Sequence, residues 1–333
     1  MVLQLHGREL NIDKIRERLE LTHENNRLLI EASDEIGDFE YRRVGSLDIA
    51  FTETEWEHLN HLVSFQKRAG DEEIQLLDKT ETRELMPALT QNIFGSRYRP
   101  TDGNLNPLKL IHNLAQAAKK QGACIYTQTK VQEIIEEAGR VKGIRTAQGE
   151  TRAEWVVSAT NAWASQLTKE VEVAPLRELA SITEVVPPFK NCIFEAGYGD
   201  IFTWGTTQTA SGNVIMGGPG APAPRGGKYN YYDEVVTLSE VKRCARYLVS
   251  MFPSLSKVNI LRCWAGTSAF TPDVIPSIGP LPGKQGLVVA VGFAAGMSHA
   301  LATGKAMAEY IESGRINLPN IYDPARFSRQ KVE

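Results

Sequence analysis

The stretch that decides the fold is GLVVAVGFAAGMSHALATG, residues 286–304. Its first part, 287–291, is a short and wholly apolar run, which is typical of a buried parallel strand. Small residues between Gly292 and Gly296 follow, and a helix is expected around 300–311. A strand, a glycine turn and a helix can bring backbone N–H groups close to a flat or anionic ligand. Taken alone, the pattern is as consistent with plain packing as with ligand binding.

The first part of the chain is predicted to contain a helix, a strand and a second helix. The charged segment 11–36 has apolar residues at helical spacing and is expected to form a solvent-facing helix. Alternating β-branched and aromatic residues predict a strand in 41–51, and 53–68 returns to helical spacing. His58 and His61 share a face of this second helix, but no third metal ligand is nearby, so a solvated face is expected and no metal site is assigned.

A third helix is predicted after Asn106-Pro107, because asparagine is a favoured N-cap and proline suits the first helical position. Gly122 is expected to end this helix. Its buried stripe is predicted to consist of Leu108, Ile111, Leu114 and Ala118.

Short strands are expected to follow this helix, at 123–128, 131–135, 141–146 and 154–157. The last strand opens into a strand-to-helix turn at 158–164. Such turns, at the carboxyl ends of strands, are where α/β sheets bind ligands.

Between 175 and 251 the residue pattern changes from helices and short strands to strand-like runs with glycine and proline. Strand-like runs at 181–186 and 213–216, with a glycine- and proline-rich segment at 217–227, predict a second, largely antiparallel domain. An amphipathic helix is expected at 233–251.

Size and composition indicate an ordinary globular protein. With 333 residues, 42% of them hydrophobic, the chain favours two domains or one large one. A formal net charge of -3 provides no broad basic field, so nucleic acid is not an expected partner. The four cysteines form no CxxC pair and are expected to be free thiols. With no secretory stretch and no apolar run of roughly 20 residues, a cytoplasmic protein without a transmembrane anchor is expected.

Several motifs near the carboxyl end occur in a recognisable order. Trp264-Ala265-Gly266, Thr271-Pro272-Asp273 and Pro276-Ser277-Ile278-Gly279 precede the turn at 292–297. Together they resemble the carboxyl-terminal signature of the D-amino-acid oxidase family of flavoenzymes, which includes glycine oxidase, sarcosine oxidase and related amine dehydrogenases. The resemblance implies that the turn covers a flavin.

Three earlier segments extend the resemblance over nearly the whole chain. The segment 101–107 (TDGNLNP) is similar to the family's Asp-Gly-x-x-(Asp/Asn)-Pro helix start. The segment 130–134 is similar to the one whose valine backbone contacts the FAD adenine, and 157–164 is similar to the Asn-Ala-Ala-Gly-Ala-Trp run near the pyrophosphate.

The resemblance implies a set of cofactor-binding residues. They are Val131, Ala159, Thr160, Trp163, Gly292, Phe293, Ala294, Ala295, Gly296 and Met297. Backbone N–H groups at 295–297 and the positive end of the next helix would stabilise negative charge at flavin N1 and O2. Because the flavin carries the redox step, no catalytic side chain is assigned, and His299 is expected to have a packing or surface role. Cys263 does not match the family's covalent flavin cysteine.

The fold class that follows is mixed α/β: a truncated FAD-binding Rossmann-like domain interleaved with an antiparallel-sheet substrate domain. The expected division places an N-terminal helix in 1–37, the substrate domain in 38–100 and 169–261, the FAD-binding domain in 101–168 and 262–316, and an irregular tail in 317–333.

One departure from the family concerns the glycine-rich turn that holds the dinucleotide. Family members open with a strand, a GxGxxG turn and a helix, and no GxGxxG occurs in this sequence. The closest string, Gly217-Gly218-Pro219-Gly220, leads into successive prolines and cannot open a helix. Met1 is therefore expected to fall inside the family's first domain. Three explanations stay open: truncation, a second chain that supplies the unit, or loss of tight FAD binding.

A second departure concerns the substrate. Glycine-oxidase-like members carry an arginine shortly after Trp-Ala-Gly to bind the substrate carboxylate, whereas this chain has Thr267-Ser268. A family tyrosine-x-arginine pattern is replaced by 201–204. The pocket is expected to be more apolar and to suit a secondary amine or an opine-like compound. Candidate substrate residues are Trp204, Trp264 and Ser268. Arg177, Arg225 and Arg262 are other candidate anion partners, for which a surface position or a structural ion pair is expected.

Two functional hypotheses result. The first is an FAD-dependent amine or amino-acid oxidase or dehydrogenase that passes a hydride from the carbon beside the substrate nitrogen to flavin N5, with a small-molecule substrate and a possible hetero-oligomeric partner subunit. The second is a noncatalytic relic or interaction subunit of the same fold. The absent glycine-rich turn favours the second hypothesis, and the retained motifs on the ring side of the flavin favour the first.

Overall fold

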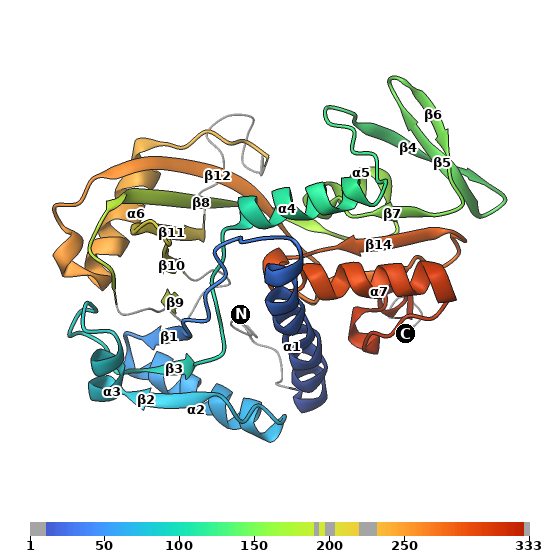
Figure 1. Ribbon diagram of the computed structural model, residues 1–333. Helices are drawn as coiled ribbons and strands as arrows, with labels where there is room; N and C mark the ends of the chain where they lie inside the picture. The colour runs from blue at the N-terminus through green and yellow to red at the C-terminus, as the bar shows by residue number, and fades with distance from the viewer. Residues whose placement is uncertain (1–10, 190–192, 197–203, 220–231, 330–333) are drawn as a thin grey trace. The chain divides into compact units, whose positions relative to one another are not determined.

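The computed structural model describes residues 11–189, 193–196, 204–219 and 232–329, and the chain divides into two compact units. Unit 1 comprises Met1–Leu19, Ile30–Asn113 and Arg177–Gly266, and unit 2 comprises Glu20–Leu29, Leu114–Leu176 and Thr267–Glu333. Both contain helices and sheets, so the predicted mixed α/β class is confirmed (Figure 1). The finer domain division predicted from the sequence stays a prediction.

Unit 1 is built on an eight-stranded sheet in the order β12-β8-β11-β10-β9-β1-β3-β2. From β8 to β2 the neighbouring strands of this order are antiparallel, except that β1 is parallel to β9. The strands are β1 (Ser46–Ala50), β2 (Gln75–Asp78), β3 (Gly95–Arg99), β8 (Ala174–Val185), β9 (Ile193–Ala196), β10 (Trp204–Gln208), β11 (Asn213–Pro219) and β12 (Ile260–Phe270).

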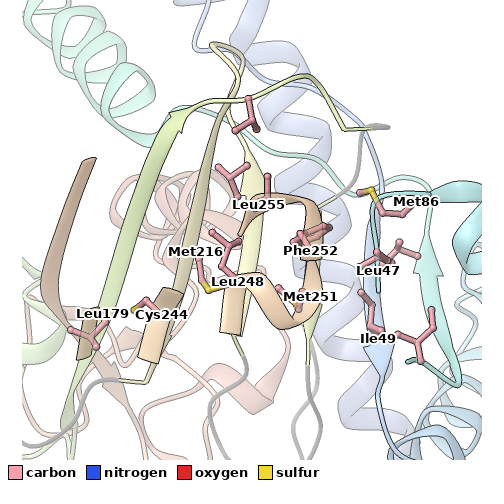
Figure 2. Close-up of a cluster of buried hydrophobic side chains, with 14 of the residues drawn as sticks. Leu47, Ile49, Met86, Leu179, Met216, Cys244, Leu248, Met251, Phe252 and Leu255 are labelled. Carbon is pink, nitrogen blue, oxygen red and sulfur yellow. The ribbon is translucent and has the colours of Figure 1, made fainter. Parts of the chain in front are cut away.

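Helix α6 (Leu238–Met251) covers part of this sheet and forms the largest hydrophobic core of unit 1. In Figure 2, Leu248 and Met251 of α6 lie beside strand residues such as Met216 and Leu47. The helix was expected to begin at 233 but begins at 238, because Thr237 forms a capping box with Glu240.

Of the other helices of unit 1, the sequence predicted α1 and α2 but not α3. Helix α2 spans Glu53–Arg68 with a capping box at Thr52, and α3 spans Lys79–Leu85. Helix α1 spans Ile12–Glu35 with Asn11 as its N-cap. The sequence predicted a solvent-facing helix, but one side of α1 is covered by the protein, because Ile15, Leu21 and Leu29 are buried. The strand expected at 41–51 is shorter and occupies only β1.

Unit 2 contains two three-stranded sheets. One has the order β13 (Ser277–Pro280), β14 (Leu287–Val291) and β7 (Val156–Ser158), with β14 antiparallel to β13 and parallel to β7. The other is the antiparallel meander β4 (Val131–Glu137), β5 (Arg140–Thr146) and β6 (Gly149–Arg152). All five residues of β14 are buried. Leu287, Val289 and Val291 belong to one hydrophobic cluster and Val288 belongs to another, so apolar side chains cover both faces of the strand, as the apolar run 287–291 predicts.

Short helical segments and one long helix complete unit 2. They are η1 (Asn161–Trp163), α5 (Ala164–Leu167), η3 (Gly296–Ser298), α7 (Ala300–Ser313), η4 (Asn320–Tyr322) and α8 (Arg326–Arg329). The last two correct the expectation that the chain after 317 is irregular. Arg326 anchors this segment, because its guanidinium binds both carboxylate oxygens of Asp273 at 2.9 and 3.1 Å.

Two sequence predictions around helix α4 (Pro107–Lys120) are wrong. Asn106 Oδ1 accepts from Lys109 N at 3.2 Å and the helix stops before Gly122, as expected, but the predicted buried stripe is not buried. Leu108 is 79% and Ile111 53% exposed, and the buried residue is Leu110.

The strand expected at 123–128 does not form, and these residues are exposed. β propensity is realised only where a strand finds a neighbour. Among the described residues none pairs with this segment. Strand β7 pairs on one side only, with β14, and its Val157 is 43% exposed. Within the described ranges, no helix is long and apolar enough to cross a membrane.

A buried ion pair joins α6 to strand β8. Glu240 and Arg177 are 3% and 1% exposed, and their side chains meet at 2.6 Å. Burial opposes ionisation of Glu240, but hydrogen bonds from Arg177 and Thr237 outweigh it and lower the pKa of the carboxyl from 4.5 to about 2. The pair is thus a structural ion pair that holds α6 against β8, which is one of the two roles expected for Arg177.

We predict that Glu240→Gln lowers the free energy of unfolding by about 3 kcal/mol at about pH 7, because it leaves the Arg177 charge buried and unpaired. Since the folded pKa is depressed, the carboxylate contributes stability above pH 4.5 and loses it as the pH falls towards 2. Urea unfolding at several pH values should therefore show the gap between wild type and variant shrinking in acid. The exposed Glu57→Gln is the control, and an unchanging gap would contradict the assignment.

Candidate functional site

The site is built on the turn between β14 and α7. Strand β14 ends at Val291, and Gly292 follows with φ +80°. Only glycine fits here, because a Cβ atom would lie 2.5 Å from Thr271 Cγ2. After Phe293 the chain turns outward, so that Ala294 and Ala295 are exposed. The turn therefore presents small residues at the carboxyl end of a buried strand.

Asn161 fixes the start of this turn. It is the first residue of η1, which follows β7, with φ 41°, and its Oδ1 accepts from Phe293 N at 2.9 Å. Its Nδ2 donates to Phe293 O at 3.2 Å. Because β7 and β14 run parallel, their carboxyl ends meet at one edge of the sheet, and Asn161 joins them there. Sequence reasoning did not select this residue.

The turn offers backbone donors. No acceptor for the N–H groups of Ala295, Gly296 or Met297 is found in the part of the chain that the structure describes. A Cβ atom on Gly296 would meet only Phe293 Cβ, at 4.0 Å, so the space beside it is open. Three successive donors before a helix start form an electropositive surface suited to the electron-rich edge of a flat ring.

His299 has the packing role that was expected. It is 2% exposed, and its Nδ1 lies 2.9 Å from Ser298 Oγ and 3.2 Å from the carbonyl oxygen of Ala295. The imidazole therefore supports the turn from inside.

The other predicted cofactor residues lie in unit 2 as well. Ala159 is exposed and Thr160 half-buried, both between β7 and η1, and the Thr160 hydroxyl lies 3.1 Å from Ser158 Oγ. Trp163 is 47% exposed in η1, close in sequence to Asn161. Val131 is the first residue of β4 and pairs with Thr146. Their role in cofactor binding stays a prediction.

The predicted substrate residues are distributed over two strands. Trp264 and Ser268 are four residues apart on β12, and alternation along a strand puts them on the same face. The guanidinium carbon of Arg262 is 5.9 Å from the Trp264 ring centroid, and Ser268 Oγ donates to Leu176 O at 3.4 Å. Trp204 begins β10. Arg225 and residues 201–203 lie outside the described residues.

Comparison with known proteins identifies the lineage. The model of a family described as "DAO: FAD dependent oxidoreductase" matches residues 4–310. The chain belongs to this family. The resemblance to glycine oxidase and its relatives and the FAD class of cofactor are thereby confirmed.

Three relatives illustrate the match. Hydrogen cyanide synthase subunit HcnC of Pseudomonas protegens is 26% identical over 275 residues, which is 80% of this chain and 63% of HcnC. Glycine oxidase of Geobacillus kaustophilus is 29% identical over 277 residues, 80% of this chain and 69% of that protein, and its crystal structure superposes with a TM-score of 0.84. The structure of L-proline dehydrogenase from P.horikoshii has a TM-score of 0.83 at 27% identity, over 97% of this chain and 86% of that one. This chain thus spans less than two thirds of the length of HcnC.

We predict that Gly292→Ala destabilises unit 2 by about 2 kcal/mol or more, because it adds both a positive-φ penalty and a clash with Thr271. Gly304→Ala is the matched control: a Cβ there meets nothing within 4 Å, and alanine should stabilise α7 by about 0.5–1 kcal/mol. Denaturant midpoints followed by circular dichroism measure both. Equal midpoints for the two variants would refute the account of this turn.

Proposed function

We propose that this chain is the flavin-ring and substrate part of an FAD-dependent oxidoreductase that oxidises the C–N bond of an N-substituted or cyclic amino acid. One observation carries the proposal: a member of this family presents three backbone donors, 295–297, on a turn of small residues, and none of the three has an acceptor among the residues that the structure describes. That turn fits the electron-rich edge of an isoalloxazine ring.

When bound, FAD would supply the two-electron acceptor that takes a hydride from the carbon beside the substrate nitrogen; the nitrogen would lose its proton, and water would hydrolyse the imine product. The protein's own part is to bind and orient. The N–H groups of Ala295, Gly296 and Met297 would hold the edge of the ring where negative charge grows, and the positive end of α7 would support them. Val131, Ala159, Thr160 and Trp163 are the proposed contacts to the rest of the cofactor.

A secondary amine is the proposed substrate class. Glycine-oxidase-like members carry a carboxylate-binding arginine shortly after Trp-Ala-Gly, whereas this chain has Thr267-Ser268, and the Ser268 hydroxyl donates to the backbone of Leu176. Trp264 is proposed to supply apolar surface. The likeness to a structure titled L-proline dehydrogenase supports this class, since proline is a cyclic secondary amine.

The pyrophosphate of FAD needs a cradle of backbone amides, and the sequence contains no GxGxxG turn. We propose that a partner subunit adds contacts at this end of the cofactor, whereas the chain alone binds FAD at saturating concentration; the name of HcnC, a synthase subunit, is consistent with such an arrangement. The absent turn also favours the alternative of a noncatalytic subunit that keeps the fold without binding FAD. The cytoplasmic location stays a prediction.

The first test is an FAD titration of the purified chain followed by visible absorption. We expect bound flavin with shifted, resolved visible bands, because the ring leaves water for an ordered environment. A spectrum that stays that of free FAD at saturating concentration would reject the enzyme proposal for this chain and leave the noncatalytic alternative.

The second test concerns substrate class. Under anaerobic conditions we expect L-proline and sarcosine to bleach the bound flavin at least about tenfold faster than glycine, the difference that roughly 1.4 kcal/mol of transition-state stabilisation makes. Stopped-flow absorbance measures the rates, and free FAD with the same amines is the control. Faster bleaching by glycine would contradict the secondary-amine assignment.

A further inference from the structure

Helix α7 does not cap its own amino terminus. Its N-cap residue, His299, makes no side-chain hydrogen bond to the helix amides, because its ring faces Ser298 and Ala295 instead. The first N–H groups of any helix lack partners within that helix and need a side chain, water or a ligand. Leu301 and Ala302 occupy the second and third helical positions, which a capping side chain normally serves.

Asn25, in the part of α1 that belongs to unit 2, supplies the missing cap from a distant point in the sequence. Its Oδ1 accepts from Leu301 N at 2.9 Å and from Ala302 N at 3.3 Å. Its Nδ2 donates to Met297 O at 3.0 Å. The side chain is 0% exposed. One buried amide thus holds both the first turn of α7 and the last residue of the donor turn.

The chemistry of this position favours asparagine over aspartate. A carboxylate caps a helix equally well, but it has no proton to donate to Met297 O. It would also put a buried negative charge behind the N–H groups of 295–297 and cancel the helix dipole there. A neutral amide satisfies all three backbone groups and leaves the positive end of α7 available to an electron-rich ligand.

We infer that Asn25 is a positioning residue for the flavin-facing turn. Asn161 fixes the turn at Phe293 and Asn25 fixes it at Met297, so that the donors between them are held from both ends. This role rests on the proposed function, since the ligand of the donors is the ring of FAD.

The contact between this part of α1 and α7 does not depend on Asn25 alone. Glu24 binds Lys305 at 2.7 Å, and Leu21 belongs to the same hydrophobic cluster as Ala302 and Ala306. Replacing Asn25 should therefore loosen the turn while the two helices stay in contact. Glu24→Gln is the matched control, because it weakens the same helix contact without touching the turn.

The experiment compares wild type, Asn25→Ala, Asn25→Asp and Glu24→Gln in the full chain. Amide hydrogen exchange without FAD reports the cap itself: Asn25→Ala should speed exchange at Leu301 and Ala302 about tenfold, the effect of losing roughly 1.4 kcal/mol of local stabilisation. FAD titration should show about tenfold weaker binding for Asn25→Ala. Asn25→Asp should keep the exchange protection but lower the flavin reduction potential. Glu24→Gln should stay within about twofold of wild type in exchange and affinity.

The outcomes separate the two claims. Wild-type FAD affinity and reduction potential in both Asn25 variants, with faster exchange in Asn25→Ala, would show a purely structural cap and overturn the positioning role alone. Wild-type exchange in Asn25→Ala would overturn the cap. Failure of wild type to bind FAD would overturn the proposed function, and the positioning role with it, whatever the exchange data show.

Discussion

The parallel pairing of β14 with β7 is the constraint on which the site depends. Val288 pairs with Val157, which aligns the two strands so that both end at the same edge of the sheet. The residues that follow them, Phe293 and Asn161, can then exchange two hydrogen bonds although they are 132 positions apart in sequence. Burial of β14 on both faces holds this register, because any slip would move apolar side chains out of two clusters.

The same edge explains why the turn can be rich in unsatisfied donors without losing its shape. Its conformation is fixed by hydrogen bonds from Asn161 and Asn25, by the close approach of Gly292 to Thr271 and by the buried His299. The donors of 295–297 are then not needed for internal hydrogen bonding. A rigid frame with free donors is what electrostatic stabilisation of a reacting group requires, since the donors need no reorganisation when charge develops. The frame lies within unit 2, whereas the core against α6 and the Arg177–Glu240 ion pair stabilise unit 1.

Local patterns predicted the elements that carry their own signals. The bounds of α2 follow from a capping box at Thr52, and the strand, turn and helix at 286–304 follow from an apolar run with glycines. The strand expected at 123–128 had suitable residues, but none of the strands that the structure describes pairs with it, which the local sequence does not reveal. Leu108 and Ile111 had helical spacing, but burial is decided by what packs on the helix.

Neither asparagine was selected as a site residue from the sequence, although Asn161 lies within the motif 157–164. Asn25 lies 276 residues from its partner Leu301. One signal was present: between Leu21 and Leu28, Asn25 is a lone polar residue on the apolar face of a helix, and a buried amide needs partners. Asn161 had the signal of following a strand at the carboxyl edge, where parallel neighbours meet. Family membership supplied the cofactor class, which neither composition nor periodicity contains.

The central claim is that the N–H groups of 295–297 contact the ring edge of FAD. Residue-resolved amide hydrogen exchange with and without saturating FAD tests it directly. The account predicts that these three amides gain protection of at least about tenfold on FAD addition, while the unit 1 helix α2 is unchanged. Unchanged exchange at 295–297 in a chain that demonstrably binds FAD would contradict it.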